Sequence, residues 1–257
     1  MLITQITDSH VLLGSRIAAR FDTAAAFERL LESLRRQETK PDLILFSGDL
    51  GEDATPQEYA FVGAGLRGLE IPVLAVPGNH DAREPLWEAL PDMLGRTDAG
   101  HLCVARDIGP LVVVGLDTIV PSAAHGEICP ARLAWLRETL KSHAGRDVLI
   151  FQHHPPIDTG LDHLDSMGIL SGREEFAGLV AEHGRVAAIL CGHVHRSVHG
   201  TCGGAPVRVS PSASHQFAFD LRKGEPYRFS DEPAQFSMHL WHEGRGLVSH
   251  VVPVVTG

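Results

Sequence analysis

Side chains that can bind metal ions stand just behind apolar runs at five places in this 257-residue chain. The stretch "VPGNHD", residues 76–81, is typical, because an apolar run stops at Pro-Gly and Asn79, His80 and Asp81 follow. Asn and Asp are also good turn formers, so this stretch alone would indicate only a turn. Four further runs end in the same way, and the five together supply Asp8, His10, Asp49, Asn79, His153, His193 and His195.

These seven residues form a ligand set of carboxylates, imidazoles and one amide oxygen, without a thiolate. Such a mixed O/N set suits Mn²⁺, Fe or Zn²⁺ rather than a structural zinc site built from cysteines. Seven ligands are too many for one tetrahedral ion and fit two ions that share a carboxylate. Two ions roughly 3.5–4 Å apart are typical of hydrolases that attack phosphorus in line.

The elements around these residues alternate between strand and helix, which predicts an α/β fold. Apolar strands are expected over 2–7, 41–49, 72–76, 101–107, 111–117, 146–154 and 185–193. Helices are expected over 22–34, 56–69, 84–94, 130–142 and 173–183, the first capped by Asp22 and the second beginning at Pro56. The predicted metal ligands therefore follow strand ends, and the crevice outside those ends is where open α/β sheets bind ligands.

After residue 195 the helical pattern stops. Antiparallel strands are expected near 196–202, 205–210, 236–242 and 247–255, with an irregular Ser- and Pro-rich loop over 211–235. No repeat or linker divides the chain, so we expect one domain over 1–257, whose part 196–257 is mainly β. The expected architecture is a two-sheet β-sandwich with helices outside.

Local spacing adds four expectations about the site. Gly48, Gly78 and Gly192 precede ligands and would permit tight turns that bring the backbone close to the metals. In "HVH", alternate residues of an extended segment point the same way, so His193 and His195 can face one metal pair. The same alternation should turn His154 away from the metals, into a supporting or structural role. Asp81 is expected to orient a neighbour or to cap the helix that follows.

Composition limits the partners. A net charge of −10 with no basic run argues against a nucleic-acid duplex, whereas a compact anion can still bind through metal cations. The four cysteines have no CxxC spacing, so free thiols are expected. No apolar run is long enough for a membrane span, and the N-terminus does not read as a signal peptide, which predicts a cytoplasmic protein. The composition leaves the oligomeric state open, and a homo-oligomer is possible.

Taken in order, the motifs D-x-H, GD, GNHD, HHPP and GHVH resemble the calcineurin-like metallophosphoesterase superfamily. "RVAAILCGHVHR" and "SPSASHQ" are similar to the bacterial class III cyclic-nucleotide phosphodiesterases and to the glycerophosphodiesterases of the same branch. The resemblance implies a four-layer α/β/β/α fold. It also implies metal-dependent hydrolysis of small phosphodiesters, with cyclic nucleotides such as cAMP first. Glycerophosphodiesters, or a broad range of diesters and monoesters, are the alternative.

By position, the resemblance assigns Asp8, His10, Asp49 and His195 to one metal, and Asp49, Asn79, His153 and His193 to the other, with Asp49 bridging. The ions would be Mn²⁺ and/or Fe, with Zn²⁺ as a further choice. His80 would act on the substrate phosphate or its leaving group. His215 would lie on a loop facing the substrate. His163 and Asp165 are expected at the rim of the pocket.

Three other functions are alternatives to the hydrolysis of small phosphodiesters. A protein phosphatase usually places an Arg beside the phosphate, and Arg83 follows GNHD closely enough to keep this alternative open. A DNA nuclease would need a basic surface, which this composition lacks. A metal-free scaffold of the same fold should have gaps in its ligand set, and none are visible. A purely structural role is a further alternative for the seven candidate ligands. If they were only turn caps or core histidines, they would have no reason to follow five strands in this order.

Overall fold

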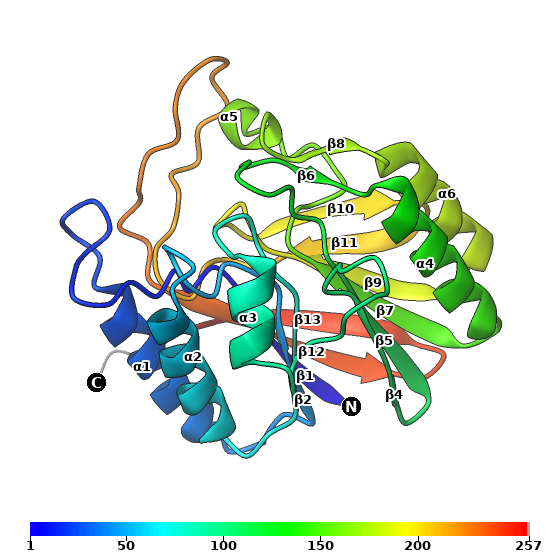
Figure 1. Ribbon diagram of the computed structural model, residues 1–257, viewed down its shortest axis with the longest axis horizontal. Coiled ribbons are helices and arrows are strands. Elements are labelled where there is room, and N and C mark those ends of the chain that lie inside the picture. Colours follow the sequence, from blue (N-terminus) through cyan, green and yellow to red (C-terminus); the bar gives the residue numbers. More distant parts are fainter. Residues whose placement is uncertain (256–257) are drawn as a thin grey trace.

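Two β-sheets pack face to face, and helices cover both outer faces of the sandwich (Figure 1). This arrangement is seen in the computed structural model, which describes residues 1–255, so that 256–257 of the predicted segment 196–257 lie outside the described residues. The five-stranded sheet has the order β13-β12-β1-β2-β3, and the six-stranded sheet has the order β10-β11-β9-β7-β5-β4. The four-layer α/β/β/α prediction is confirmed.

The strands of the first sheet are β1 (Leu2–Ile6), β2 (Leu43–Phe46), β3 (Val73–Ala75), β12 (Gln235–His242) and β13 (Gly246–Pro253). Those of the second are β4 (Val104–Ile108), β5 (Leu111–Leu116), β7 (Asp147–Gln152), β9 (Val186–Cys191), β10 (Val198–Cys202) and β11 (Ala205–Val209). A further pair, β6 (Gly126–Glu127) and β8 (Ile169–Ser171), was not predicted, because strands this short carry no periodic signal.

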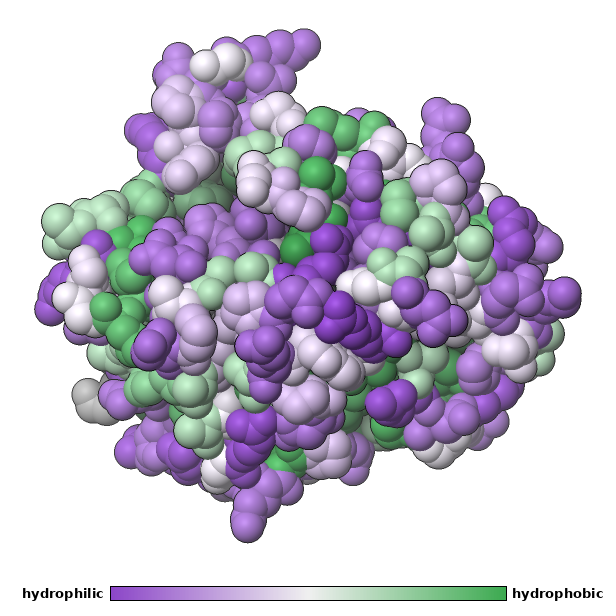
Figure 2. Space-filling model, in the orientation of Figure 1, coloured by the Kyte–Doolittle hydropathy of each residue, from purple (hydrophilic) through white to green (hydrophobic). Residues whose placement is uncertain are grey.

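The central strands read as unbroken apolar runs because both of their faces are buried. In β2, Ile44 and Phe46 point to the helix layer, whereas Leu43 and Leu45 point to the second sheet. The second sheet is built in the same way, so one hydrophobic cluster fills the space between the sheets and one lies under each helix layer. On the face drawn in Figure 2, hydrophilic residues predominate and hydrophobic ones are scattered among them.

The helices follow their local signals. On the first sheet lie α1 (Thr23–Arg35), α2 (Pro56–Arg67) and α3 (Arg83–Ala89), and on the second lie α4 (Pro130–Ser142) and α6 (Arg173–His183). Asp22 caps α1, as predicted. The expected helix over 84–94 ends at Ala89 instead, because Pro91 disfavours the helical conformation of the residue before it. No helix among residues 1–255 combines the length and the apolar composition of a membrane span.

The C-terminal part completes both sheets. β10 pairs antiparallel with β11, and β12 with β13, as predicted, but β11 lies parallel to β9. β12 returns to the first sheet and pairs antiparallel with β1. Residues 211–234 contain no helix or strand and form the loop that rises at the upper left of Figure 1, near α5 (Asp162–Asp165).

The intersheet core yields a first prediction. Leu45 is fully buried between the sheets, so Leu45→Ala should lower the free energy of unfolding by about 2–5 kcal/mol through lost burial and a cavity. Leu170 is 60% exposed, and Leu170→Ala should change stability by about 0.5 kcal/mol or less. Urea titrations followed by circular dichroism measure both values, and equal effects would contradict the described packing.

Candidate active site

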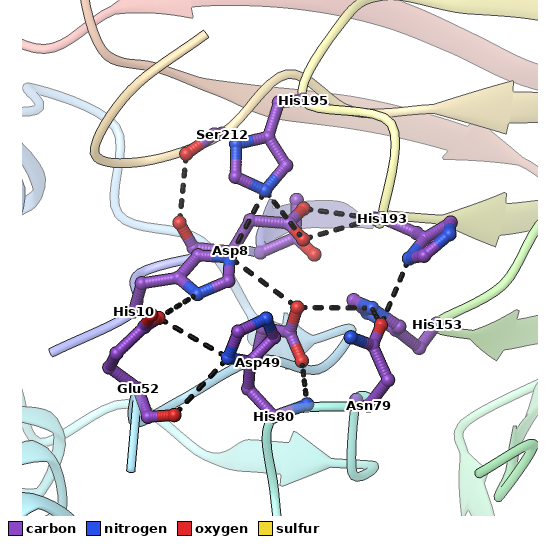
Figure 3. Close-up of polar contacts among 12 residues, drawn as sticks. Asp8, His10, Asp49, Glu52, Asn79, His80, His153, His193, His195 and Ser212 are labelled. Carbon is purple, nitrogen blue, oxygen red and sulfur yellow. Dashed lines mark hydrogen bonds and ion pairs between the residues drawn. The ribbon is translucent and has the colours of Figure 1, made fainter. Parts of the chain in front are cut away.

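The seven predicted metal ligands converge at one edge of the sandwich, where both sheets end (Figure 3). Asp8, Asp49 and Asn79 follow β1, β2 and β3, which run parallel to one another in the first sheet. His153 follows β7, and His193 follows β9 in the second sheet. All seven except Asn79 are buried. Because the two sheets contribute different residues, the site lies at the junction of the two sheets.

One half of the site contains Asp8, His10, Asp49 and His195. The Nε2 atoms of His10 and His195 are 3.1 Å apart. His10 Nε2 lies 3.4 Å from Asp49 Oδ2, and His195 Nε2 lies 3.4 Å from Asp8 Oδ1. Four potential ligand atoms therefore surround one small space.

The other half contains Asn79, His153 and His193. Asn79 Oδ1 lies 3.0 Å from His153 Nε2 and 3.0 Å from His193 Nδ1. His153 Nε2 is also 3.3 Å from Asp49 Oδ2, the same oxygen that approaches His10 in the first half. Asp49 thus contacts both halves.

Hydrogen bonds on the outer side of the rings decide which nitrogen faces inward. His10 Nδ1 donates to Glu52 Oε2 over 2.7 Å, and His195 Nδ1 donates to the His215 carbonyl over 2.8 Å. Because these oxygens act as acceptors, each Nδ1 carries a proton, and in the neutral tautomer that this selects, each Nε2 presents a lone pair to the cluster. Two lone pairs and two carboxylates then face one another without a donor between them. A cation between these atoms would remove this repulsion, so the residues present fit a metal ion.

Burial and neighbouring carboxylates shift the pKa values of the imidazoles in opposite directions. Burial lowers the pKa of His10 and lowers that of His193 to about 3, which keeps both rings neutral and able to bind a metal. For His153, burial is outweighed by Asp49 and Asp8, which raise its pKa to about 9. His193 Nε2 is buried without a hydrogen-bond partner among the described residues. Positive charge is thus favoured close to Asp49.

The backbone is left-handed at five of the seven residues: Asp8 (φ 52°), His10 (45°), Asp49 (54°), His193 (71°) and His195 (50°). Such conformations are uncommon for residues with a side chain, and they concentrate at functional sites. The predicted extended conformation of 193–195 is therefore wrong. Both imidazoles do face the cluster, but through two consecutive bends rather than through strand alternation.

Three glycines allow the turns to approach this closely. A Cβ on Gly78 would lie 2.2 Å from Asp49 Oδ1, and one on Gly192 would lie 2.0 Å from Thr7 Oγ1. Gly48 has a φ of +100° as well as a crowded surrounding. The predicted reason for these glycines, a close backbone approach, is confirmed.

His80 and Glu52 form a second layer beside the first half. Glu52 Oε2 lies 2.7 Å from His10 Nδ1 and 3.3 Å from His80 Nδ1 (Figure 3). The His80 side chain is 37% exposed, and its backbone N–H donates to Asp49 Oδ1 over 2.9 Å. Burial lowers the pKa of His80, but Asp49 and Glu52 outweigh it and raise this pKa. Sequence reasoning missed Glu52, although it stands three residues after Asp49.

Asp81 holds the loops in place. Its carboxylate accepts hydrogen bonds from the backbone N–H groups of Gly78, Leu50 and Gly51 over 2.8, 3.2 and 3.3 Å. It therefore orients neighbouring turns, in agreement with the expectation that Asp81 orients a neighbour. The other expectation, a helix cap, is wrong, since the N-cap residue of α3 is Ala82 and no side chain caps this helix.

His154 lies beside the cluster, within 4.8 Å of ring nitrogens of His153 and His193, but both of its own ring nitrogens have other partners. Nδ1 lies 2.8 Å from Thr118 Oγ1, and Nε2 donates to the Ala124 carbonyl over 3.1 Å. Burial lowers its pKa, so the ring is neutral. Its centroid is 4.6 Å from that of His193, which places it directly behind that residue. This position agrees with a supporting role.

His215 lies against the cluster, whereas His163 lies further out. The His215 ring is 4.7 Å from that of His195 and 5.3 Å from that of His10. His163 is exposed on α5, and its ring contacts Tyr227 at 5.4 Å. Asp165 accepts hydrogen bonds from Thr159 and Gly160 and so stabilises the turn that precedes α5.

Two bacterial proteins are similar over most of this chain. A "Probable glycerophosphodiester phosphodiesterase" of Arcobacter nitrofigilis is 32% identical over 251 residues, 97% of this chain and 92% of that protein. A "3′,5′-cyclic adenosine monophosphate phosphodiesterase" of Pseudomonas aeruginosa is 31% identical over 221 residues, 85% of this chain and 78% of that protein.

The fold also occurs in solved structures. A dimetal phosphatase from Danio rerio superposes with a TM-score of 0.64 over 99% of both chains, at 15% sequence identity. Residues 1–197 match the family model of the calcineurin-like phosphoesterases, and this match includes all seven residues of the cluster. The chain therefore belongs to the calcineurin-like phosphoesterase family.

Proposed function

We propose that this protein hydrolyses small phosphodiesters, with 3′,5′-cyclic nucleotides such as cAMP first and glycerophosphodiesters second. The observation that carries the proposal is the two-part cluster around Asp49, in which lone pairs and carboxylates converge beside a partly exposed imidazole. The two bacterial relatives, named for these two activities, support the substrate class.

In this proposal Asp8, His10, Asp49 and His195 hold one divalent ion, and Asp49, Asn79, His153 and His193 hold the other. Mn²⁺ or Fe suits this O/N set best, and Zn²⁺ is also compatible. When bound, two such ions would activate a water molecule and neutralise charge on the phosphoryl oxygens. Glu52, Ser47 and the His215 carbonyl orient the imidazoles from outside.

His80 is the residue we assign to the leaving group. Its Nδ1 lies 3.2 Å from the Glu52 carbonyl, which fixes the ring and leaves Nε2 free of any described hydrogen bond. From this position the imidazole can donate a proton, or a hydrogen bond, to the departing alkoxide.

Arg83 is engaged in a way that disfavours the protein phosphatase alternative. Its guanidinium lies 2.6 Å and 2.9 Å from the two oxygens of Asp117, and it also donates to the Ile119 carbonyl over 2.8 Å. Both Asp117 oxygens are buried, so a bidentate pair of this kind is costly to break. The Arg that would clamp a phosphoserine is thereby already paired with a buried carboxylate.

The metal assignment predicts about two divalent ions per chain in protein purified without chelator or reconstituted with Mn²⁺. Asp49→Ala should weaken both metal sites together, because Asp49 contacts both halves. Asp8→Ala should weaken mainly its own site and retain more of the other ion than Asp49→Ala does. Inductively coupled plasma mass spectrometry measures the content. One ion or none in the native protein under saturating Mn²⁺ would exclude the two-metal assignment.

Removing His80 should affect turnover rather than metal content. His80→Ala should lower kcat about 10²- to 10⁴-fold, the usual loss for a positioned acid or base. The loss should be smaller for diesters with nitrophenolate as leaving group, because this group needs little protonation. Steady-state kinetics with both substrate types decide the point. Equal losses would leave electrostatic stabilisation as the only role of His80.

Glu52 offers a companion test. Glu52→Gln keeps the size of the side chain but removes the charge beside His10 and His80, and should lower activity about 10- to 100-fold. Asp53→Asn, at the exposed neighbouring position, is the matched control and should behave like the native protein.

The substrate class is tested by comparing kcat/KM for cAMP, glycerophosphoethanolamine, p-nitrophenyl phosphate and a phosphopeptide. We expect the two small diesters to exceed the monoester and the peptide, with cAMP first, because the bacterial relatives are named for such diesters. The net charge of −10 adds to this against the phosphopeptide, since anions are attracted only locally, at the metal ions. A higher kcat/KM for the monoester or the phosphopeptide than for every small diester would overturn the proposal.

A further inference from the structure

Four aromatic residues outside the metal cluster form a continuous group at its edge: Phe21, Phe217, Tyr227 and Phe229, here called the aromatic wall. None of them takes part in the hydrolysis described above. Phe21 comes from the segment between β1 and α1, and the other three come from the loop 211–234.

The aromatic wall begins at a predicted metal ligand and extends outward. The Phe217 ring stacks on His195 with centroids 4.2 Å apart and planes inclined by 19°. Tyr227 contacts Phe217 at 4.3 Å, and the Tyr227 residue is 43% exposed. Two ring contacts therefore lead from the cluster to solvent.

A second series of contacts runs through His215. Phe21 stacks on the His215 ring at 5.1 Å with an inclination of 27°, and Phe229 approaches the same ring at 5.2 Å. Phe21 and Phe229 also contact each other at 5.1 Å. Because His215 in turn contacts His10 and His195, both series meet the same half of the cluster.

Backbone and charged contacts hold the aromatic wall in this position. Ser230 N–H donates to the Gln216 carbonyl over 2.9 Å, and Phe217 pairs with Phe229 in a β-bridge, so the loop folds back on itself as a ribbon. Arg20, next to Phe21, forms an ion pair with Asp231. The loop is thereby tied to the segment that carries Phe21, and the two are drawn close together at the left of Figure 1.

The aromatic wall borders the half of the cluster that contains His10, and His80 lies beside the same half. The His80 and His10 ring centroids are 4.6 Å apart, so the group assigned to the leaving alcohol adjoins the half that the aromatic wall borders. The opposite half is bordered by His154, which is hydrogen-bonded to Thr118 and Ala124. A substituent on the departing oxygen would therefore extend toward the aromatic wall.

We propose that the aromatic wall, through its exposed end at Tyr227, stacks against the planar base of a nucleotide substrate and thereby sets the preference for nucleotide diesters over glycerol-based ones. Phe217 is buried against His195. Phe21 lies between His215 and the Arg20 guanidinium, so these two rings hold the exposed end in place. Every nucleobase has a π-face, and stacking on an aromatic side chain contributes substantially to binding at sites for single bases. A glycerol substituent has no ring and therefore gains no binding energy from stacking. The inference rests on the function proposed above and names the group that recognises the non-reacting part of the substrate.

The experiment compares Phe21→Leu, Tyr227→Leu and Phe229→Leu, each of which keeps an apolar side chain but removes the ring. In the Mn²⁺-loaded enzyme, the ratio of KM for cAMP to KM for glycerophosphoethanolamine should rise about tenfold or more in at least Tyr227→Leu. Phe219→Leu is the matched control, since Phe219 is on the same loop, is 67% exposed and lies outside the aromatic wall. Tyr227→Phe, which keeps the ring, should restore the native ratio.

Inhibition separates this inference from the proposed function. 5′-AMP should inhibit hydrolysis of bis-p-nitrophenyl phosphate more strongly than glycerol 3-phosphate does, and Tyr227→Leu should remove that advantage. This holds even if cAMP itself proves a poor substrate, a result that would contradict only the proposed substrate order. Unchanged ratios in all three variants, or equal increases in KM for both diesters, would overturn the role of the aromatic wall. Circular dichroism and thermal melting check that each variant is folded.

Discussion

Crowding of electron-pair donors around Asp49 is the constraint on which the rest of this structure depends. Imidazole lone pairs, carboxylates and an amide oxygen lie 3.0–3.4 Å from one another in two adjoining groups. Such an arrangement is unfavourable unless positive charge lies between the atoms. The raised pKa of His153 and the outward-donating nitrogens of His10 and His195 both reflect this need for a cation.

The fold bears the cost of this arrangement. Five residues of the cluster have left-handed backbone conformations, each of which costs on the order of 1–3 kcal/mol unless the surroundings enforce it. The surroundings here are rigid, because the strands leading into the site are buried on both faces by three hydrophobic clusters. Gly78 and Gly192 provide the space that any side chain would fill. Rigid strands with irregular ends thus present convergent ligands.

The site is asymmetric, and its asymmetry matches its chemistry. On the side of His10 lie Glu52, the partly exposed His80, and the aromatic rings that begin at His215. On the side of His193, the buried and neutral His154 closes the cluster against Thr118. One side thus contains a partly exposed imidazole, which suits the leaving-group role proposed for His80, whereas the other is backed by a buried, hydrogen-bonded ring.

The sequence by itself determined the fold class, the helix starts at Asp22 and Pro56, and the convergence of all seven residues of the cluster. These features depend on local signals, namely apolar period, capping residues and the polar residue that follows each strand. Only the tertiary structure decided that Glu52 joins His10 to His80, which ring nitrogens face inward, and that Phe21 meets Phe229. Each of these depends on a partner distant in the chain, and apolar periodicity reports that a residue is buried but not which residue it contacts. The left-handed bends at His193 and His195 escaped prediction for the same reason, because these residues bond to distant partners, His193 N–H to Asp8 and His195 Nδ1 to the His215 carbonyl.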